Sequence, residues 1–400
     1  MMERWLGTAL AVLFLATPAM AQQLEFGGEV RPRFEIRDPV LTAGALGTQE
    51  FTSMRTRASL SVTLDRDVRS FVQFQDVRMF GEETSTMDRQ ADGLDLHQGW
   101  VEIGHAETSD WSIRVGRQEA IYGDQRLVGA VNWAQQARSF DGARVRFRPS
   151  STAVVDGLAF RVSDADFGGA DESLYGLYST LTAAGAVDVY ALLNTYALSG
   201  IARDRYTLGG SWISSQGPVV WRVQAAYQGG AIESQLTARD ISAFMVGGRI
   251  GTELADGIEA TLWYDYLSGD DDPADDVNRV FSTLFATNHK FYGYMDFFTD
   301  IPNHTAQRGL QDLAVKGSYD LGEGRLVGAD LHSFHLAAAD GVASSHIGEE
   351  LDLTYRMTYA PGVSLTAGAS YFMAADAWST VLANPDENQV WGYLMLDVMF

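Results

Sequence analysis

The chain has 400 residues, no cysteine and a formal net charge of −23 at pH 7. The absence of cysteine excludes a disulfide scaffold and thiolate metal sites, so strand pairing and packing must close the fold. The net charge is opposite to the basic footprint of nucleic-acid-binding proteins, and we expect no nucleic-acid partner.

The first 21 residues predict a cleaved signal peptide. Arg4 supplies the positive start, residues 6–16 form a short apolar run, and Ala19-Met20-Ala21 fits a cleavage site. We therefore expect export through the Sec pathway, with residues 22–400 forming a single barrel domain. Later apolar runs stay well short of the ~20 residues that a membrane-spanning helix requires, so helical spans are not expected.

A period of two in the hydrophobic pattern is the strongest structural signal. In residues 24–36 the even positions are mostly apolar and the odd positions mostly charged, and residues 54–65, 219–228, 258–266 and 351–357 repeat this alternation. Since successive side chains of a strand face opposite sides, each segment has one face for lipid and one for water. The sequence thus predicts an all-β fold, a transmembrane antiparallel β-barrel with up-and-down topology.

Eighteen strands are expected, an even number as in single-chain bacterial barrels. Tight turns alternate with longer polar links at 37–50, 80–93, 195–203, 229–240 and 268–306, which is typical of periplasmic turns and extracellular loops. The predicted strands are 24–36, 51–64, 68–79, 94–104, 111–118, 138–148, 152–162, 172–181, 186–194, 204–214, 218–229, 240–251, 257–267, 310–319, 324–336, 347–359, 362–373 and 388–400.

The last predicted strand ends with Phe400. A terminal Phe that closes an alternating strand is similar to the signal by which the outer-membrane assembly machinery recognises barrels, although an ordinary last sheet strand is the alternative. We therefore expect the protein in the lipid bilayer of a Gram-negative outer membrane. The sequence does not indicate an oligomeric state, and a monomer is the default expectation.

A barrel of this size leaves a water-filled lumen, so a channel is the expected function. Only two of the 29 basic residues are lysine, and arginine on the polar face favours anions because the guanidinium fork matches carboxylates. The alternative is that lumen carboxylates such as Glu29, Glu35 and Asp265 neutralise the arginines across strands. The predicted lumen arginines are Arg31, Arg33, Arg55, Arg57, Arg114, Arg144, Arg146, Arg148, Arg161 and Arg222.

Two sequence blocks resemble the alginate export family of outer-membrane proteins. The first contains Arg114-Val-Gly-Arg-Gln118, Tyr122-Gly-Asp-Gln-Arg-Leu127, Trp133 and Arg138-Ser-Phe-Asp-Gly-Ala-Arg144. The second contains Phe281-Ser-Thr-Leu-Phe285 and His289-Lys-Phe-Tyr-Gly-Tyr-Met-Asp296. The resemblance runs through the mature chain and implies an eighteen-stranded barrel whose arginine-lined constriction passes an acidic polysaccharide outward.

The resemblance also implies roles for individual residues. His289, Tyr292 and Asp296 form a loop motif in the link 268–306; for His289 and Asp296 the expected role is a hydrogen-bonded loop anchor and the alternative is a substrate contact. This sequence departs from the family pattern in one respect. The resemblance implies an extended periplasmic turn before the last hairpin, as in the longer alginate exporter, whereas the corresponding turn here is only Ala360-Pro361-Gly362. By position, the constriction arginines are Arg117, Arg126, Arg138 and Arg144, with Asp124 and Asp141 holding their guanidinium groups.

Other functions remain open at this point. A general or small-solute anion-preferring porin shares every barrel feature, and a structural or adhesin-like barrel is a further alternative. An outer-membrane enzyme is not expected, because His332 and His335 fall on opposite faces of a strand and cannot act on one site. No cofactor is expected. The acidic run 270–276 is expected to be a solvated loop, with a calcium site as the alternative.

Overall fold

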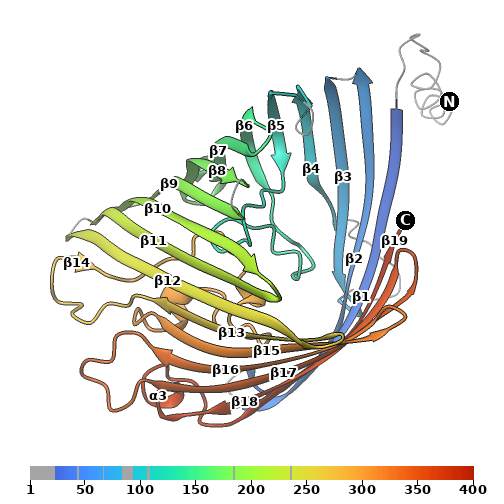
Figure 1. Cartoon of the computed structure of the whole chain (residues 1–400). Coiled ribbons are helices and arrows are strands. Elements are labelled where there is room, and N and C mark those ends of the chain that lie inside the picture. Colours follow the sequence, from blue (N-terminus) through green and yellow to red (C-terminus); the bar gives the residue numbers. More distant parts are fainter. Residues whose placement is uncertain are drawn as a thin grey trace, which may run out of the picture.

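Eighteen long strands form a closed antiparallel barrel in the computed structural model, which describes residues 23–42, 45–65, 67–82, 93–105, 109–182, 185–234 and 237–400 (Figure 1). The expected all-β, up-and-down barrel is confirmed, while the expected signal peptide lies outside the described residues. The barrel strands are β1 (Gln23–Thr42), β2 (Ala45–Asp65), β3 (Val68–Met79), β4 (Leu94–Ile103), β5 (Trp111–Gln118), β6 (Phe140–Ser150), β7 (Ala153–Ser163), β8 (Asp171–Leu181), β9 (Ala186–Leu198), β10 (Ile201–Gln216), β11 (Val219–Ser234), β12 (Ala238–Ala255), β13 (Ile258–Leu267), β15 (Leu310–Gly322), β16 (Arg325–Leu336), β17 (His346–Ala360), β18 (Val363–Ala374) and β19 (Gln389–Met399).

Each barrel strand pairs with the next along the chain, and β19 pairs with β1 to close the cylinder. The backbone N–H of Gly28 donates to the carbonyl of Phe400 at 2.7 Å, which extends this closing seam to the last residue. Full closure removes the unpaired strand edges that could not be tolerated in lipid.

The two faces of the wall have opposite polarity. On β10, Arg205 and Thr207 are buried, whereas Tyr206 and Leu208 are 42% and 51% exposed. A soluble domain would bury its apolar side chains, so an outward row of exposed apolar residues indicates contact with lipid. The alternation that predicted the strands therefore also gives their orientation.

The connections differ between the two ends of the barrel. One end has tight turns, in which Gly217, Gly257 and Gly362 take positive φ angles of 59°, 71° and 74° that favour glycine. Three of the expected long links, 37–50, 195–203 and 229–240, are instead largely strand. Polar side chains there do not interrupt pairing, because the ladder uses backbone groups.

Two connections fold back into the barrel. We call residues 119–139, between β5 and β6, the first insert, and residues 268–309, between β13 and β15, the second insert; Figure 1 shows the first running inside the barrel. The second insert contains β14 (Val277–Asn278), η2 (Asn288–Lys290) and α2 (Ile301–His304). Val128 and Phe285 form a parallel β-bridge that joins the two inserts. The buried aromatic residues of both inserts pack with the barrel wall in one apolar core.

The remaining elements are short and lie in other connections. They are η1 (Ala165–Phe167), between β7 and β8, and α3 (Asp376–Thr380), between β18 and β19. Of the helices in the described part of the chain, none has the length and apolar character needed to cross a bilayer.

Candidate functional site

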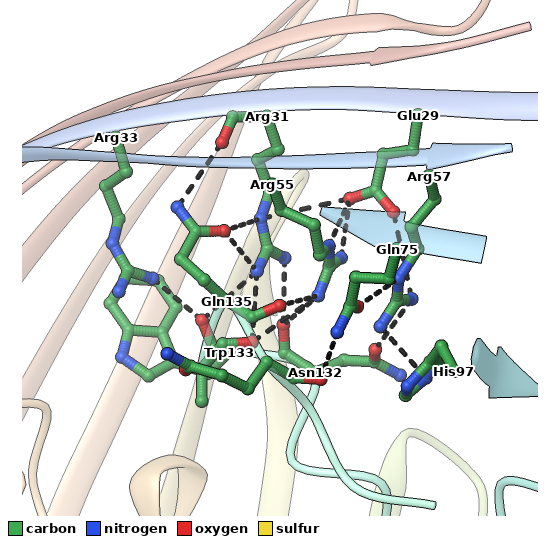
Figure 2. A network of polar contacts seen from close by, with 12 residues as sticks. Glu29, Arg31, Arg33, Arg55, Arg57, Gln75, His97, Asn132, Trp133 and Gln135 are labelled. Carbon is green, nitrogen blue, oxygen red and sulfur yellow. Dashed lines mark hydrogen bonds and ion pairs between the residues drawn. The ribbon is translucent and has the colours of Figure 1, made fainter. Parts of the chain in front are cut away.

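Four arginines of β1 and β2 hold the first insert against the barrel wall, and we call them the arginine anchor. Arg31 Nη1 donates to the carbonyl of Asn132 at 2.8 Å, and Arg33 Nη1 donates to the carbonyl of Trp133 at 2.7 Å. Figure 2 shows how these side chains converge on the same short stretch of backbone. The members of the anchor are Arg31, Arg33, Arg55 and Arg57.

The chemistry of arginine suits this role. Residues 130–138 have no regular secondary structure, and the carbonyl groups of Asn132 and Trp133 take their donors from outside the insert. A guanidinium carries five N–H donors in a fixed fork and can serve several carbonyls at once. The anchor residues are only 3% to 7% exposed, so they lie on the lumen face but are covered by the insert.

Carboxylates pair closely with two of the anchor arginines, and a neutral amide accepts a hydrogen bond from a third. Arg55 Nη2 lies 2.5 Å from Glu29 Oε1, and Arg33 Nε lies 2.8 Å from Glu35 Oε1. Arg57 Nε donates to the Gln75 side chain at 2.8 Å. Of these contacts, only the Arg55–Glu29 pair is a cross-strand ion pair of the kind that the alternative interpretation describes, because Arg33 and Glu35 lie on the same strand and Gln75 carries no charge.

The second insert is held by carboxylates of β17 instead. Glu350 Oε1 accepts from the backbone N–H of Met295 at 2.8 Å, and Asp352 Oδ2 accepts from that of Tyr294 at 3.3 Å. Gly293 takes a φ of 82°, and a Cβ there would lie 2.6 Å from the Glu350 carboxyl group. The wall thus presents arginines where an insert offers carbonyls, and carboxylates where an insert offers N–H groups.

Arg126 and Arg138 join the two inserts to each other and to the wall. Arg126 Nη2 lies 2.6 Å from Asp265 Oδ2, and its Nη1 donates to the Tyr292 hydroxyl at 2.9 Å. Arg138 Nη1 donates to the carbonyls of Phe285 and, at 3.2 Å, Ala286. Burial lowers the pKa of Arg138 to about 10, which leaves it protonated at neutral pH.

The expected loop motif lies where the inserts meet. His289 stacks on Trp133 with ring centroids 4.1 Å apart, and its Nδ1 lies 2.8 Å from Asp296 Oδ1. Tyr292 is 1% exposed, and burial raises the pKa of its hydroxyl above the usual range. These contacts tie His289 to the first insert through Trp133 and to Asp296 within its own insert.

A second group of lumen arginines remains partly open to water, and we call it the basic wall. Arg114 Nε and Arg144 Nη2 both contact Glu102 Oε2, at 2.8 and 2.9 Å, and Arg146 pairs with Asp156. The side chains of Arg114, Arg144 and Arg146 are 16%, 13% and 22% exposed. Because two guanidinium groups share one carboxylate, the basic wall carries an excess positive charge facing the lumen.

The structure places Arg117 and Asp141 on the outer face, not in the lumen as expected. They pair with each other at 2.9 Å and share the parity of the outward residues Val115 and Val145. Arg161, also expected in the lumen, lies opposite Asp141 on the same outer face. The physical reason is strand alternation: residues 114 and 117 are three apart and cannot share a face.

Asp124 has a different principal partner from the expected one. It lies 2.9 Å from Arg222 Nη2, whereas its distance to Arg126 Nε is 3.9 Å. Arg222 is buried on the lumen face of β11, so the pair links the first insert to a third part of the wall. Arg126 takes Asp265 as its closer carboxylate.

Arginines neutralise part of the acidic run 270–276. Arg239 Nη2 lies 2.6 Å from Asp270 Oδ2, and Arg279 Nη2 lies 2.7 Å from Asp275 Oδ2. The hydrogen bond from Arg279 lowers the pKa of Asp275. Within the described residues no group of three potential ligands is arranged for a metal ion.

Several lumen residues were missed by sequence reasoning. Glu102 lies between the outward residues Val101 and Ile103, so alternation could have assigned it to the lumen. The same alternation along β10 could have assigned Arg203 and Arg205 to the lumen. No sequence pattern marks Gln75, Gln135, Glu350 or Asp352 as partners of an insert, because those contacts depend on how the connections pack.

Comparisons with known proteins agree with this architecture. The BenF-like porin from Pseudomonas fluorescens Pf-5 superposes with a TM-score of 0.63 at 12% identity, covering 94% of this chain and 98% of that chain. Pseudomonas aeruginosa OccK5 (OpdH) gives 0.62 at 11% identity, covering 94% and 98%, and OccK11 (OpdR) gives 0.60 at 14% identity, covering 94% and 96%. At such low identity the likeness shows the fold alone. No curated protein matches the sequence.

The family match is more informative. Residues 22–384 match the family described as alginate export, which agrees with the resemblance carried by the two sequence blocks. Together with the porin-like barrel, this match supports an outer-membrane channel. Since it covers nearly the whole chain, the protein belongs to the alginate export family.

Proposed function

We propose that the channel passes anionic solutes and that acidic saccharides are its substrate class. The observation that carries the proposal is the basic wall, where Arg114 and Arg144 share the single carboxylate of Glu102. Membership of the alginate export family supports the saccharide part of the proposal.

The electrostatic argument concerns charge that the protein does not itself neutralise. The arginine anchor is covered by the first insert and so contributes little to the solute path. The basic wall is open to lumen water, and its planar guanidinium groups match a carboxylate geometrically better than an ammonium would. An anion in the lumen can therefore replace water around Arg114 and Arg144, while a cation is repelled.

Selectivity measurements test the proposal directly. Purified protein in a planar bilayer under a potassium chloride gradient should give a reversal potential that favours chloride. The double substitution Arg114→Gln and Arg144→Gln should shift the reversal potential toward the value for potassium, because it removes the two positive charges that pair with Glu102. The control is Arg117→Gln. It also removes one arginine charge, but from the outer face, and should leave the reversal potential unchanged.

The outcomes separate the proposal from its rivals. A wild-type reversal potential on the potassium side would contradict anion preference. An unchanged potential in the double variant would show that the basic wall does not control selectivity. In each case, retained heat-modifiable migration on gels would show that the barrel is folded.

A small-solute porin remains a second candidate, and the packing of the inserts favours it. Backbone hydrogen bonds across the Val128–Phe285 bridge, at 2.8 and 2.9 Å, fix the two inserts together within the barrel. A fixed obstruction favours small anions over a long chain. Block by uronate oligomers of increasing length distinguishes the two: a polymer channel should bind longer chains more tightly, whereas a small-solute porin should show no gain beyond the shortest.

The contacts of the histidines do not support an enzyme. His332 is buried on the lumen face with its Nδ1 2.9 Å from Asp312, while His335 stacks on His346 at the outer side of the same strand. The two imidazoles thus face different environments. Transport remains the function that the site supports best.

A further inference from the structure

A polar cavity of about 470 Å³ lies beside the second insert, near the barrel end that carries the long connections. Its walls come from β8, β9, β10 and β11 on one side, from residues 278–307 of the second insert on the other, and from Arg138 of the first insert. Its charged and amide side chains include Arg138, Arg203, Arg205, Glu172 and Asn194. The basic wall contributes no residue to this lining, so the cavity is a separate feature of the lumen.

Arg205 is the unusual member of the cavity. It is only 6% exposed, and among the described residues it has no hydrogen bond or ion pair with the protein. Its Nε atom is fully buried without an acceptor. Burying a charged group without a partner is costly, so a guanidinium in this position indicates that a ligand supplies the missing acceptor.

The neighbouring groups reinforce the demand for an anion. Arg203 Nη2 donates to Asn194 at 3.1 Å and lies 3.5 Å from Glu172, so the Glu172 carboxylate is already paired with Arg203. Arg138 uses only Nη1 in its contacts with backbone carbonyls. Three guanidinium groups thus border the cavity against two carboxylates, those of Glu172 and Asp300.

We propose that this cavity binds the carboxylate of an acidic sugar, with Arg205 as its central ligand. The carboxylate fits the guanidinium fork of Arg205, and Phe285, Ile232 and Pro302 supply apolar surface for the sugar ring. The site rests on the proposed function, because it presumes that acidic saccharides enter the lumen. It deepens that function by giving the saccharide a binding site near the outer mouth, apart from the basic wall.

Block of the ionic current measures binding at this site. Glucuronate, added to the side that carries the long connections, should interrupt the current of wild-type channels, whereas neutral glucose should not. Arg205→Met should weaken the glucuronate block about tenfold to a hundredfold, the range for losing a hydrogen-bonded charge contact. Arg205→Lys should weaken it less, because charge remains but the fork is lost.

The control is Arg161→Met, the same substitution on the outer face, which should leave the block unchanged. Removing the unpaired charge of Arg205 should not impair folding, and gel migration of the folded barrel checks this. Equal glucuronate block in wild type and Arg205→Met would overturn the site, as would equal block by glucose. If chloride preference persists while the Arg205 effect is absent, only this site fails; if chloride preference is absent, the proposed function fails.

Discussion

Replacing Arg31 with methionine tests the arginine anchor. Arg31 donates to the carbonyls of Asn132, Trp133 and Ala134, at 2.8, 3.3 and 3.2 Å. Methionine preserves most of the side-chain length and apolar stem but removes every donor. Each of the three carbonyls then loses one donor and keeps another: Trp133 keeps Arg33, Asn132 keeps Arg55, and Ala134 keeps Arg55 and the backbone N–H of Ala137.

The expected cost follows from those three contacts. A hydrogen bond contributes about 0.5–1.5 kcal/mol net, and no carbonyl is left without a donor, so the loss of three bonds is expected to cost about 2–4 kcal/mol in total. This cost falls on the first insert, because the barrel itself is held by its continuous strand ladder. The opening equilibrium of the insert should therefore shift by roughly 30- to 1,000-fold.

Amide hydrogen exchange measures this equilibrium. Peptides covering residues 130–138 should lose protection in Arg31→Met, while strand peptides retain theirs. Arg114→Met is the matched control, since it removes a lumen arginine that has no contact with this part of the insert. Unchanged protection of residues 130–138 in Arg31→Met, or an equal loss in the control, would refute the anchor.

Two further substitutions test the other contacts of the inserts. Gly293→Ala should destabilise the second insert by about 1–3 kcal/mol, because φ is 82° and the new Cβ meets the Glu350 carboxyl group; normal exchange protection at residues 290–298 would contradict this. Trp133→Ala removes ring contacts to His289 at 4.1 Å and Arg33 at 4.2 Å, and should cost about 2–4 kcal/mol. In this variant, amide hydrogen exchange should become faster in both inserts. A faster exchange confined to residues 130–138 would show that the two inserts are not coupled.

The alternation of apolar and polar residues predicted the barrel because the pattern is present within each strand separately. The charged and apolar residues of 24–36 assign both the strand and its lumen face without knowledge of any other segment, and the structure confirms the strand. The same rule, applied to Arg114 and Arg117, separates them onto opposite faces. The resemblance to the family grouped Arg117 with constriction arginines, and the parity of the strand gives its actual position.

The lumen contacts were harder to predict because they join distant segments. Arg31 contacts residues about a hundred positions away, and Arg126 meets Tyr292 at a separation of 166. The sequence shows that Arg31 faces inward but not that an insert covers it. The same limit hid the partners of Glu350 and Asp352, which are backbone N–H groups with no sequence signature.

The most direct test of the account compares the entry of an acidic sugar and a neutral sugar of similar size into liposomes that contain the protein. Glucuronate should enter faster than glucose, and the difference should shrink when Arg114 and Arg144 are both replaced by glutamine. Faster entry of glucose in the wild type would contradict the central claim that the lumen selects anionic saccharides.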